Sequence, residues 1–384
     1  MLNNTSVIIA HVPYEIRGGE DIHVELLIDA YCRIGFTPIL FPIDRRPPGS
    51  RLWDAAKSLS LSESMQEFEQ LWTNSGASYV HLHNIYPILG PRFLRHLASR
   101  KIPTVMTVHN HRFYCTNGLA LREGKICKDC KASPVAWRAV TRNCNGDIKK
   151  SVYYAAAITE SRASNLLQKA VTRFVAPSPY IKNELISFGI SSDKISVIVN
   201  PTATNPQAVS STLDFACDVF YAGRLSQEKG ILPLLATIEK IPELRIAIAG
   251  GGPLEKDVKN AAARLKNLTY FGALSHEDVL QTIRNAKVTV LPSICNEILP
   301  TFVLESLSLG KRAIVPDLDS TRWLANEEFG AILCQPGNAD DLARAIREAV
   351  KKPVLTDVTA ALLKKKFGIE RFCGELLELA NSIL

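Results

Sequence analysis

Short apolar runs alternate with longer amphipathic segments along this chain, and the alternation limits its fold more than any other feature. Residues 7–10 (Val-Ile-Ile-Ala) and 288–292 (Val-Thr-Val-Leu-Pro) are typical of buried strands. A segment with helical periodicity follows each run after a loop. Strands that alternate with helices predict parallel sheets covered by helices, so we expect an α/β architecture.

The length of the chain predicts two domains, because one hydrophobic core rarely organises 384 residues. Residues 201–215 are rich in Pro, Ser, Thr and Asn, which is the composition of a linker. We therefore expect one Rossmann-like, doubly wound domain over 1–200 and a second over 216–365. A last helix with an apolar face is expected over 366–384.

Two carboxylates lie eight positions apart where a loop is predicted to enter a helix. Glu297 belongs to the loop and Glu305 to the helix, with Pro300 near the first turn and Gly310 just past the end. The start of such a helix favours an anion. Carboxylates on either side could accept hydrogen bonds from sugar or ribose hydroxyls. The alternative is a solvated glutamate in the loop and a glutamate near the helix start that favours the helix dipole.

A glycine-hinged turn follows the predicted strand 218–222 and carries two cations. Gly223 lacks the Cβ that would block a close approach of the backbone to a ligand. Arg224 offers a planar fork and Lys229 a point charge, so the pair can converge on one diphosphate. Gly251 lies in a second glycine-rich turn after another apolar run. The alternative is a pair of ordinary surface charges.

Two features of the first half lie where ligands of doubly wound domains bind. Gly18 and Gly19 follow the first predicted strand and could let the backbone approach a phosphate or an acceptor. His109 follows the predicted strand 104–108 and could donate to a sugar hydroxyl or a phosphate. A plain tight turn and a structural histidine are the alternatives.

Four cysteines follow the pattern C-x11-C-x2-C-x13-C: Cys115, Cys127, Cys130 and Cys144. A C-x2-C pair fits two corners of a tetrahedral Zn²⁺ site, and two more thiolates complete it. We predict a closed, structural Zn²⁺ site that stabilises an insertion over 111–150. Independent thiols are the alternative. Disulfides are the least favoured reading, because nine mostly scattered cysteines suggest a reducing compartment.

Most of the net charge of +7 is concentrated in residues 112–173, which hold 12 basic and 4 acidic residues mixed with aromatic ones. Such a surface suits an anionic partner. We favour an anionic membrane face or a diphosphate-bearing acceptor over nucleic acid, because no nucleic-acid module is recognisable. A solvated rim is the remaining alternative. Neither a spanning helix nor a signal peptide is predicted, so we expect a cytoplasmic protein, with a peripheral position on the inner membrane face left open.

These motifs, taken in order, resemble those of the GT-B-fold retaining glycosyltransferases of family 4. The resemblance rests on the E-x7-E pair Glu297 and Glu305, the segment 223–230 (G-R-L-x-x-E-K-G), the G-G-x-x-x-H opening with His23, the T-x-H motif at His109 and the G-x-G-P loop at 250–253. It implies two Rossmann-like domains that face each other across a cleft, with the helix 366–384 packed back on the N-terminal domain.

The resemblance also implies a retaining, metal-independent hexosyltransferase. Arg224 and Lys229 would hold the diphosphate of a UDP- or GDP-linked sugar and stabilise the charge of the leaving group. Glu305 would accept from ribose hydroxyls and Glu297 would contact the donor sugar, with His109 also in the active site. The implied donor site is lined by Gly18, Gly19, Gly223, Arg224, Lys229, Gly251, Leu299, Pro300, Thr301 and Glu305.

Three departures from the family pattern leave the donor sugar open. They are residues 298–300 (Ile-Leu-Pro), Ser306 and residues 317–321 (Asp-Leu-Asp-Ser-Thr). The acceptor would be a glycan or a lipid-linked molecule in polysaccharide or glycoconjugate biosynthesis. A sugar-nucleotide epimerase and a non-catalytic nucleotide-sugar-binding protein are the alternative functions. The oligomeric state stays open.

Overall fold

The computed structural model describes residues 5–12, 19–42, 62–86, 89–202, 215–326, 329–353 and 355–384. Contacts within the chain divide it into two compact units. Unit 1 comprises Met1–Ala120, Cys127–Asn200 and Phe372–Leu384, and unit 2 comprises Leu121–Ile126 and Pro201–Arg371. Most of the expected linker 201–215 lies outside the described residues.

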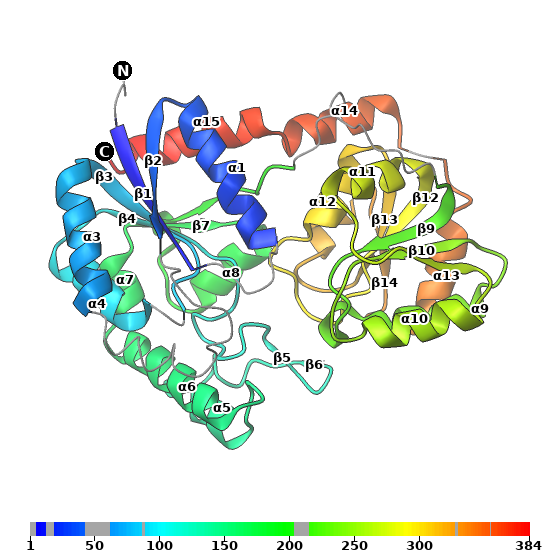
Figure 1. Ribbon diagram of the computed structural model, residues 1–384, viewed down its shortest axis with the longest axis horizontal. Coiled ribbons are helices and arrows are strands. Elements are labelled where there is room, and N and C mark those ends of the chain that lie inside the picture. The colour runs from blue at the N-terminus through cyan, green and yellow to red at the C-terminus, as the bar shows by residue number, and fades with distance from the viewer. Residues whose placement is uncertain are drawn as a thin grey trace. The chain divides into compact units, whose positions relative to one another are not determined.

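Unit 1 is built on a six-stranded parallel sheet with the order β2-β1-β3-β4-β7-β8 (Figure 1). Its strands are β1 (Thr5–His11), β2 (Phe36–Pro42), β3 (Ala77–Leu82), β4 (Thr104–Thr107), β7 (Arg173–Ala176) and β8 (Ile195–Val197). Its helices are α1 (Gly19–Arg33), α3 (Ser62–Ser75), α4 (Gly90–Ser99), α5 (Trp137–Thr141), α6 (Ile148–Ala163), α7 (Leu166–Ala170), α8 (Pro179–Ser187) and most of α15 (Ile369–Asn381).

The strand order of unit 1 reverses direction at β1. The chain passes from β1 to its neighbour β2 on one side, and then crosses to β3 on the other side. Val7, Ile8 and Ile9 of β1 are fully buried, because helices cover both faces of the sheet. Ligands of doubly wound domains bind beyond the carboxyl ends of the strands at such a reversal.

The cysteine-bearing segment between β4 and α7 contains two short strands and two helices. It contains the hairpin strands β5 (Leu121–Arg122) and β6 (Lys125–Ile126), followed by α5 and α6. Cys130, Ala139 and Ile158 form part of a small core between α5, α6 and the preceding loop. Figure 1 shows both helices at the lower edge of unit 1, away from its sheet.

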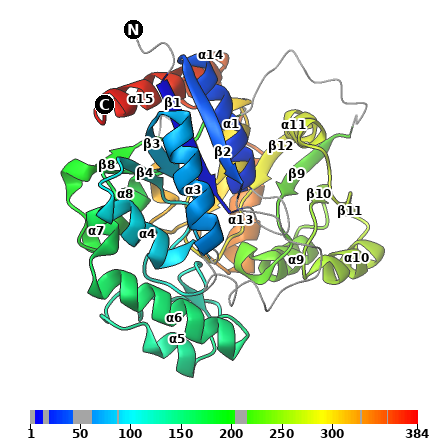
Figure 2. The same ribbon diagram turned by 60° about the vertical axis from the view of Figure 1, so that its left-hand side comes forward.

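The last helix packs within unit 1 beside α1, as Figure 2 shows. The ring of Phe372 lies 5.8 Å from that of His23, and Cys373 Sγ donates to the Ala30 carbonyl at 3.9 Å. Leu376 and Leu379 are among the apolar residues of α15 that are buried. Their burial stabilises the packing of residues 372–384 within unit 1, although the preceding residues belong to unit 2.

Unit 2 repeats the doubly wound design, with the order β11-β10-β9-β12-β13-β14 and all neighbours parallel. Its strands are β9 (Cys217–Ala222), β10 (Ile246–Ala249), β11 (Leu268–Tyr270), β12 (Ala286–Val290), β13 (Arg312–Pro316) and β14 (Ile332–Cys334). Its helices are α9 (Ile231–Lys240), α10 (Glu255–Arg264), α11 (His276–Asn285), α12 (Thr301–Ser308), α13 (Ala339–Ala349) and α14 (Asp357–Lys366).

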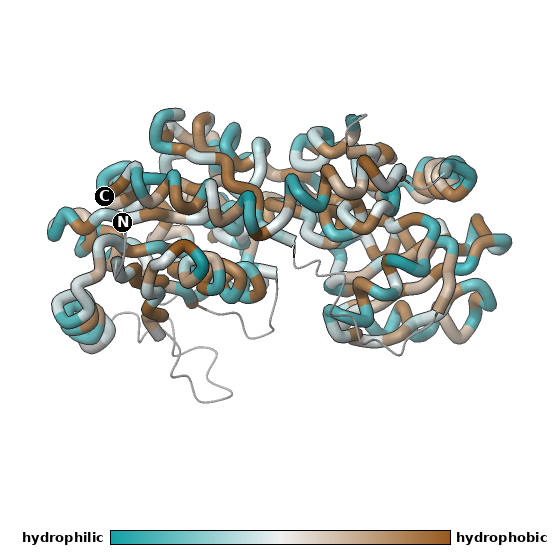
Figure 3. The backbone as a smooth tube through the Cα atoms, turned by 90° about the horizontal axis from the view of Figure 1, so that it is seen from above, coloured by the Kyte–Doolittle hydropathy of each residue, from teal (hydrophilic) through white to brown (hydrophobic). Residues whose placement is uncertain are grey.

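Two apolar layers cover the faces of this second sheet. Helices α9, α10 and α13 pack on one face, with Leu234, Val258 and Ile346 fully buried. Leu280 and Ile283 of α11 pack on the other face, and α12 lies there too. Figure 3 shows hydrophobic and hydrophilic stretches alternating along the helices of both units, which is the pattern that this layered packing requires. The two parallel sheets confirm the predicted α/β class.

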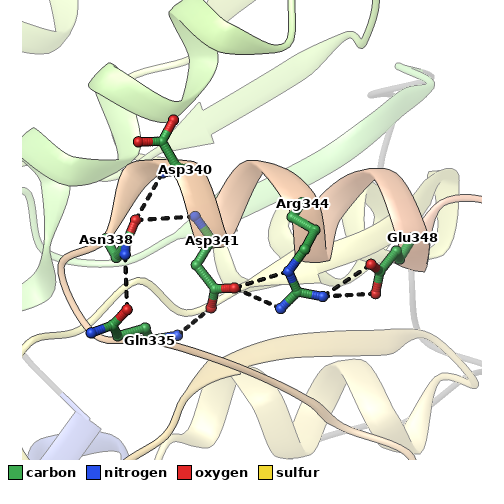
Figure 4. Close-up of polar contacts among 6 residues, drawn as sticks. All are labelled: Gln335, Asn338, Asp340, Asp341, Arg344 and Glu348. Atoms are coloured by element: carbon green, nitrogen blue, oxygen red, sulfur yellow. Dashed lines mark hydrogen bonds and ion pairs between the residues drawn. The ribbon is translucent and has the colours of Figure 1, made fainter.

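Side chains rather than packing alone fix the start of α13 (Figure 4). The Asn338 side chain accepts hydrogen bonds from the backbone N–H groups of Asp340 and Asp341 at 3.0 and 3.1 Å. The Asp341 carboxylate in turn accepts from the Gln335 N–H at 2.6 Å and pairs with Arg344. These contacts satisfy donors that a helix start otherwise leaves unpaired.

Candidate active site

The loops that follow β9 and β12 meet at the point where the strand order of unit 2 reverses. These two strands are neighbours in the sheet although three helices and two strands separate them in sequence. The N–H of Ile294, in the second loop, donates to the Glu228 carbonyl, in the first loop, at 3.0 Å. Because ligands of doubly wound sheets bind at such a reversal, these loops define the candidate site.

A glycine makes the close approach of the two loops possible. Gly230 has φ +69°, and a Cβ added to it would lie 1.8 Å from the Pro292 carbonyl oxygen. Gly250 has φ +130° and the same relation to the Gly223 carbonyl oxygen, at 1.9 Å. Gly251, the glycine singled out from the sequence, would place its Cβ in ordinary contact with Glu255 Oε2, at 3.8 Å. Gly250, and not Gly251, is therefore the position at which a side chain would clash with the backbone, and the sequence did not indicate this.

Lys229 and Glu297 form the central contact of the site. Lys229 Nζ donates to both carboxylate oxygens of Glu297 at 2.8 Å. Burial alone would lower the pKa of Lys229, but the Glu297 carboxylate outweighs this effect and holds that pKa above its usual value. Lys229 therefore carries its positive charge at neutral pH. The sequence had placed these two residues in one site, and the structure brings them together.

Neighbouring hydroxyls orient the Glu297 carboxylate and backbone. Ser293 Oγ donates to Glu297 Oε1 at 2.5 Å, and the Glu297 N–H donates to Ser320 Oγ at 3.0 Å. Ser320 belongs to the segment 317–321, which departs from the family pattern in sequence. That segment thus supports the glutamate directly, a role that the sequence did not indicate.

Glu305 lies on α12 and has a partner that sequence reasoning missed. His276 Nε2 lies 2.8 Å from Glu305 Oε1, and Glu305 is 6% exposed. His276 is the first residue of α11, directly after the capping residue Ser275. The sequence offered only a histidine directly after a possible capping serine, and it is the fold that places His276 beside Glu305.

The other predicted donor-site residues differ in their surroundings. Arg224 and Gly223 lie exposed on the first loop, and Arg224 makes no ion pair with a described residue. Pro300 is buried and precedes the first residue of α12, Thr301, in agreement with the expected helix start. Leu299 is half-buried beside it. Arg224 is thus the available cation of the site, whereas Lys229 is already paired.

In unit 1, His109 belongs to a buried group of histidines. His109 Nε2 lies 2.8 Å from His83 Nδ1, and its ring lies 5.0 Å from that of His23. Burial lowers the pKa of His23 to about 3, so its ring is neutral at neutral pH. Gly18 lies outside the described residues, and Gly19 is the exposed first residue of α1.

The four clustered cysteines are all free thiols in the same part of unit 1. Burial and the neighbouring Cys115, Cys144 and Cys127 thiols raise the pKa of Cys130 to about 11. Among the described residues, ligand atoms within 4.8 Å of one another are found for His23, His83 and His109, and for no trio of these thiols. The predicted tetrahedral arrangement is therefore not formed in this structure.

The contact between His276 and Glu305 gives a prediction that can be measured directly. The hydrogen bond to the carboxylate is the main reason why the pKa of His276 lies above the ordinary 6.5. The contact therefore stabilises unit 2 fully below pH of about 6.5 and is lost as the pH rises through the higher, folded-state value. We expect an NMR titration midpoint for His276 above 6.5, and a lower midpoint in Glu305→Gln. Identical midpoints in both proteins would contradict the contact.

Two family profiles match the chain. The profile described as Glycosyl transferases group 1 matches residues 217–365, and the profile described as Glycosyltransferase Family 4 matches residues 20–205. The first covers the sheet of unit 2 with the Lys229 and Glu297 loops. The second covers nearly all of the described sheet of unit 1 beyond β1.

Curated relatives match parts of the chain. A sulfoquinovosyl transferase of Arabidopsis thaliana is 28% identical over 137 residues, which is 34% of this chain and 26% of that protein. A putative teichuronic acid biosynthesis glycosyltransferase of Bacillus subtilis is 31% identical, over 36% of this chain and 35% of its own length. The O-antigen chain mannosyltransferase C of Escherichia coli is 23% identical, over 51% and 57%. The matched region thus spans between about a quarter and somewhat over half of these relatives.

Solved structures match the chain over its whole length. Sucrose-phosphate synthase from Thermosynechococcus elongatus superposes with a TM-score of 0.72 at 16% identity, over 98% of each chain. Anabaena HepE in complex with UDP-glucose has a TM-score of 0.64 at 15% identity, over 98% of this chain and 99% of that one. The lipopolysaccharide outer core galactosyltransferase WaaB has 0.65 at 16%, over 99% and 100%. These matches confirm the predicted GT-B fold.

Proposed function

Because the chain belongs to the group 1 glycosyltransferases of family 4, we propose that it transfers a hexose from a nucleoside-diphosphate sugar to an acceptor with retention of anomeric configuration. The acceptor is a glycan or a lipid-linked molecule of polysaccharide or glycoconjugate synthesis. The observation that carries the proposal is the Lys229–Glu297 pair at the strand reversal of unit 2.

The diphosphate is proposed to bind at the turn after β9 that carries both Arg224 and Lys229. Arg224 is exposed and without an ion-pair partner among the described residues, so its fork is available to phosphate oxygens. Lys229 would turn part of its hydrogen bonding from Glu297 to the diphosphate as the bond to the sugar breaks. Cations fixed beside the developing charge stabilise the transition state without a metal ion. Turnover should therefore not depend on added Mg²⁺.

The two glutamates are proposed to contact the two sugars of the donor. Glu297, held by Ser293 and Ser320, would contact the transferred hexose and favour the positive charge that develops at its anomeric carbon. Glu305, held by His276, would accept from ribose hydroxyls. The leaving phosphate oxygen would take the acceptor's proton on the same face of the sugar, which retains configuration.

An assay with and without acceptor tests this function. The purified chain is incubated with UDP-, GDP- and dTDP-sugars, and free nucleotide, free sugar and coupled product are measured. Transfer predicts a product that forms only with acceptor and that keeps the donor's anomeric configuration by NMR. Conversion of the donor without acceptor would favour an epimerase, and no conversion under any condition would favour a binding protein.

The cysteine-bearing segment is proposed to hold a structural Zn²⁺ ion. Support comes from the C-x2-C spacing and from the mutual effect of the four thiols on the pKa of Cys130. Zinc would draw the thiolates closer than they lie here. We expect metal analysis to find one zinc per chain fewer in Cys127→Ser than in the wild type, and no such loss in Cys32→Ser. Equal zinc in both variants would contradict this assignment.

Helices α5 and α6 are proposed to meet an anionic membrane. Val135, Trp137, Ile148 and Val152 are 47–62% exposed, and the basic residues Arg138, Lys149 and Lys150 are exposed among them. Apolar side chains surrounded by basic ones suit a negatively charged bilayer surface. Within the described ranges, none of the helices is long and apolar enough to cross a bilayer. Binding to vesicles with anionic lipid that weakens with salt supports this proposal, and equal binding to neutral vesicles would contradict it.

A further inference from the structure

Five of the eight histidines of the chain gather at one place in unit 1. They are His11, His23, His81, His83 and His109. β1 ends at His11, His83 directly follows β3, His109 lies just beyond β4, and His23 projects from α1. This is the carboxyl-end edge of the sheet at its strand reversal, where doubly wound domains bind ligands.

Three of these histidines meet the geometric condition for a shared metal ion. One ring nitrogen from each of His23, His83 and His109 lies within 4.8 Å of the others. His23 and His83 are 3% and 1% exposed. Among the described residues, His23 Nδ1 and His83 Nε2 have no hydrogen-bond partner. Buried polar atoms are normally paired, so an unpaired ring nitrogen on each of two neighbouring histidines leaves a place for a ligand that accepts a lone pair.

Two carboxylates next to this cluster could offset the charge of a cation. His11 Nε2 lies 3.0 Å from Asp21 Oδ1, and His11 Nδ1 lies 3.6 Å from Glu20 Oε1. The His11 ring lies 6.1 Å from that of His83. Carboxylates that hold a neighbouring imidazole are common around histidine-bound metals, because they orient the rings and add negative charge.

We propose that His23, His83 and His109 bind one transition-metal dication of the Zn²⁺ type. Imidazole nitrogen suits Zn²⁺, Co²⁺ and Ni²⁺, whereas Mg²⁺ and Ca²⁺ prefer oxygen ligands. Metal–nitrogen distances of about 2.0–2.1 Å place the nitrogens of a tetrahedral site roughly 3.3 Å apart, so the rings close slightly on binding. Three histidines leave one coordination position for water.

The three ligands of this site belong to unit 1, whereas Lys229 and Glu297 of the proposed donor site belong to unit 2. The histidine site also differs from the proposed thiolate site in ligand chemistry. A bound metal would occupy the ring of His109, which the family resemblance places in the active site. We therefore expect added Zn²⁺ to inhibit any transfer activity, although the test of binding below does not depend on that activity.

Cobalt binding to the full-length chain tests the site. Co²⁺ with histidine ligands absorbs in the visible range, and only thiolate ligands add charge-transfer absorption at shorter wavelength, so the spectrum separates the two sites. In Cys127→Ser, which lacks one ligand of the proposed thiolate site, we expect one Co²⁺ per chain without the thiolate signal. His83→Gln and His23→Gln should each weaken that binding by at least about 100-fold, since losing a ligand costs more than losing an outer-shell partner.

The control is His96→Gln, which alters a histidine of α4 that pairs with Glu69 outside the cluster. It should keep the wild-type cobalt affinity. The two ligand variants come from different elements, α1 and the loop after β3, and circular dichroism identifies any that fail to fold. The proposal is overturned if Cys127→Ser binds no cobalt, or if a folded histidine variant made in that background binds cobalt as tightly as Cys127→Ser itself.

Discussion

Lys229→Ala is expected to lower turnover by about 10²- to 10³-fold, the usual cost of removing one group that stabilises charge in a transition state. In the resting structure Lys229 Nζ bonds both oxygens of Glu297, and in the proposed reaction it stabilises the departing diphosphate. The measurement is kcat with the nucleotide sugar that the donor assay identifies. Lys259→Ala is the matched control, because Lys259 is an exposed lysine of α10 that pairs with Glu255.

The same substitution has a structural consequence that must be separated from the catalytic one. Without Lys229, the buried Glu297 carboxylate loses its cation, which destabilises the fold because an unpaired buried charge is costly. The double variant Lys229→Ala/Glu297→Gln removes that charge and should recover part of the melting temperature without recovering turnover. Turnover at the wild-type level in folded Lys229→Ala would show that the lysine has no part in the reaction.

Gly230→Ala is expected to destabilise unit 2 by about 2–6 kcal/mol, from about 1–3 kcal/mol for the left-handed backbone and about 1–3 kcal/mol for overpacking. The added Cβ would lie 1.8 Å from the Pro292 carbonyl oxygen, and φ is +69°. Backbone atoms fill that space, so the loops after β9 and β12 must separate. Donor affinity should fall together with the free energy of unfolding, which denaturant titration measures.

Gly251→Ala provides the control for this effect. Gly251 has no positive φ, and the nearest atom to its added Cβ is Glu255 Oε2 at 3.8 Å. Its free energy of unfolding should therefore stay within about 0.5–1 kcal/mol of wild type. Equal loss in both glycine variants would mean that the packing of the two loops does not control the stability of unit 2.

The features that the sequence predicted well are those that local patterns determine. The strand that ends before Pro292 and the helix that begins just after Pro300 both lie where apolar runs and helix-end residues place them. The contact between Lys229 and Glu297 depends on β9 and β12 being neighbours in the sheet, which composition and local patterns do not show. The two residues were assigned to one site from the family motifs alone. The resemblance to the GT-B glycosyltransferases is therefore confirmed by the fold and by both family profiles.

The features that escaped prediction depend on contacts between distant segments. His276 lies 29 positions from Glu305, and His83 lies 60 positions from His23, so no local pattern joins either pair. Gly250 is the glycine at which a Cβ would clash with backbone atoms. Only the structure around each residue distinguishes it from Gly251. Such pairs become visible once the sheet order places strand ends side by side.

Nucleoside-diphosphate binding tests the central claim most directly. Calorimetry with UDP and GDP should show binding of at least one of them to the wild-type chain. Arg224→Ala and Lys229→Ala should each weaken that binding by about 10- to 100-fold, as expected for hydrogen bonds to charged groups, whereas Lys259→Ala should leave it unchanged. Equal affinity of all four proteins for the nucleotide, or binding of neither nucleotide by the wild type, would contradict a diphosphate site on these loops.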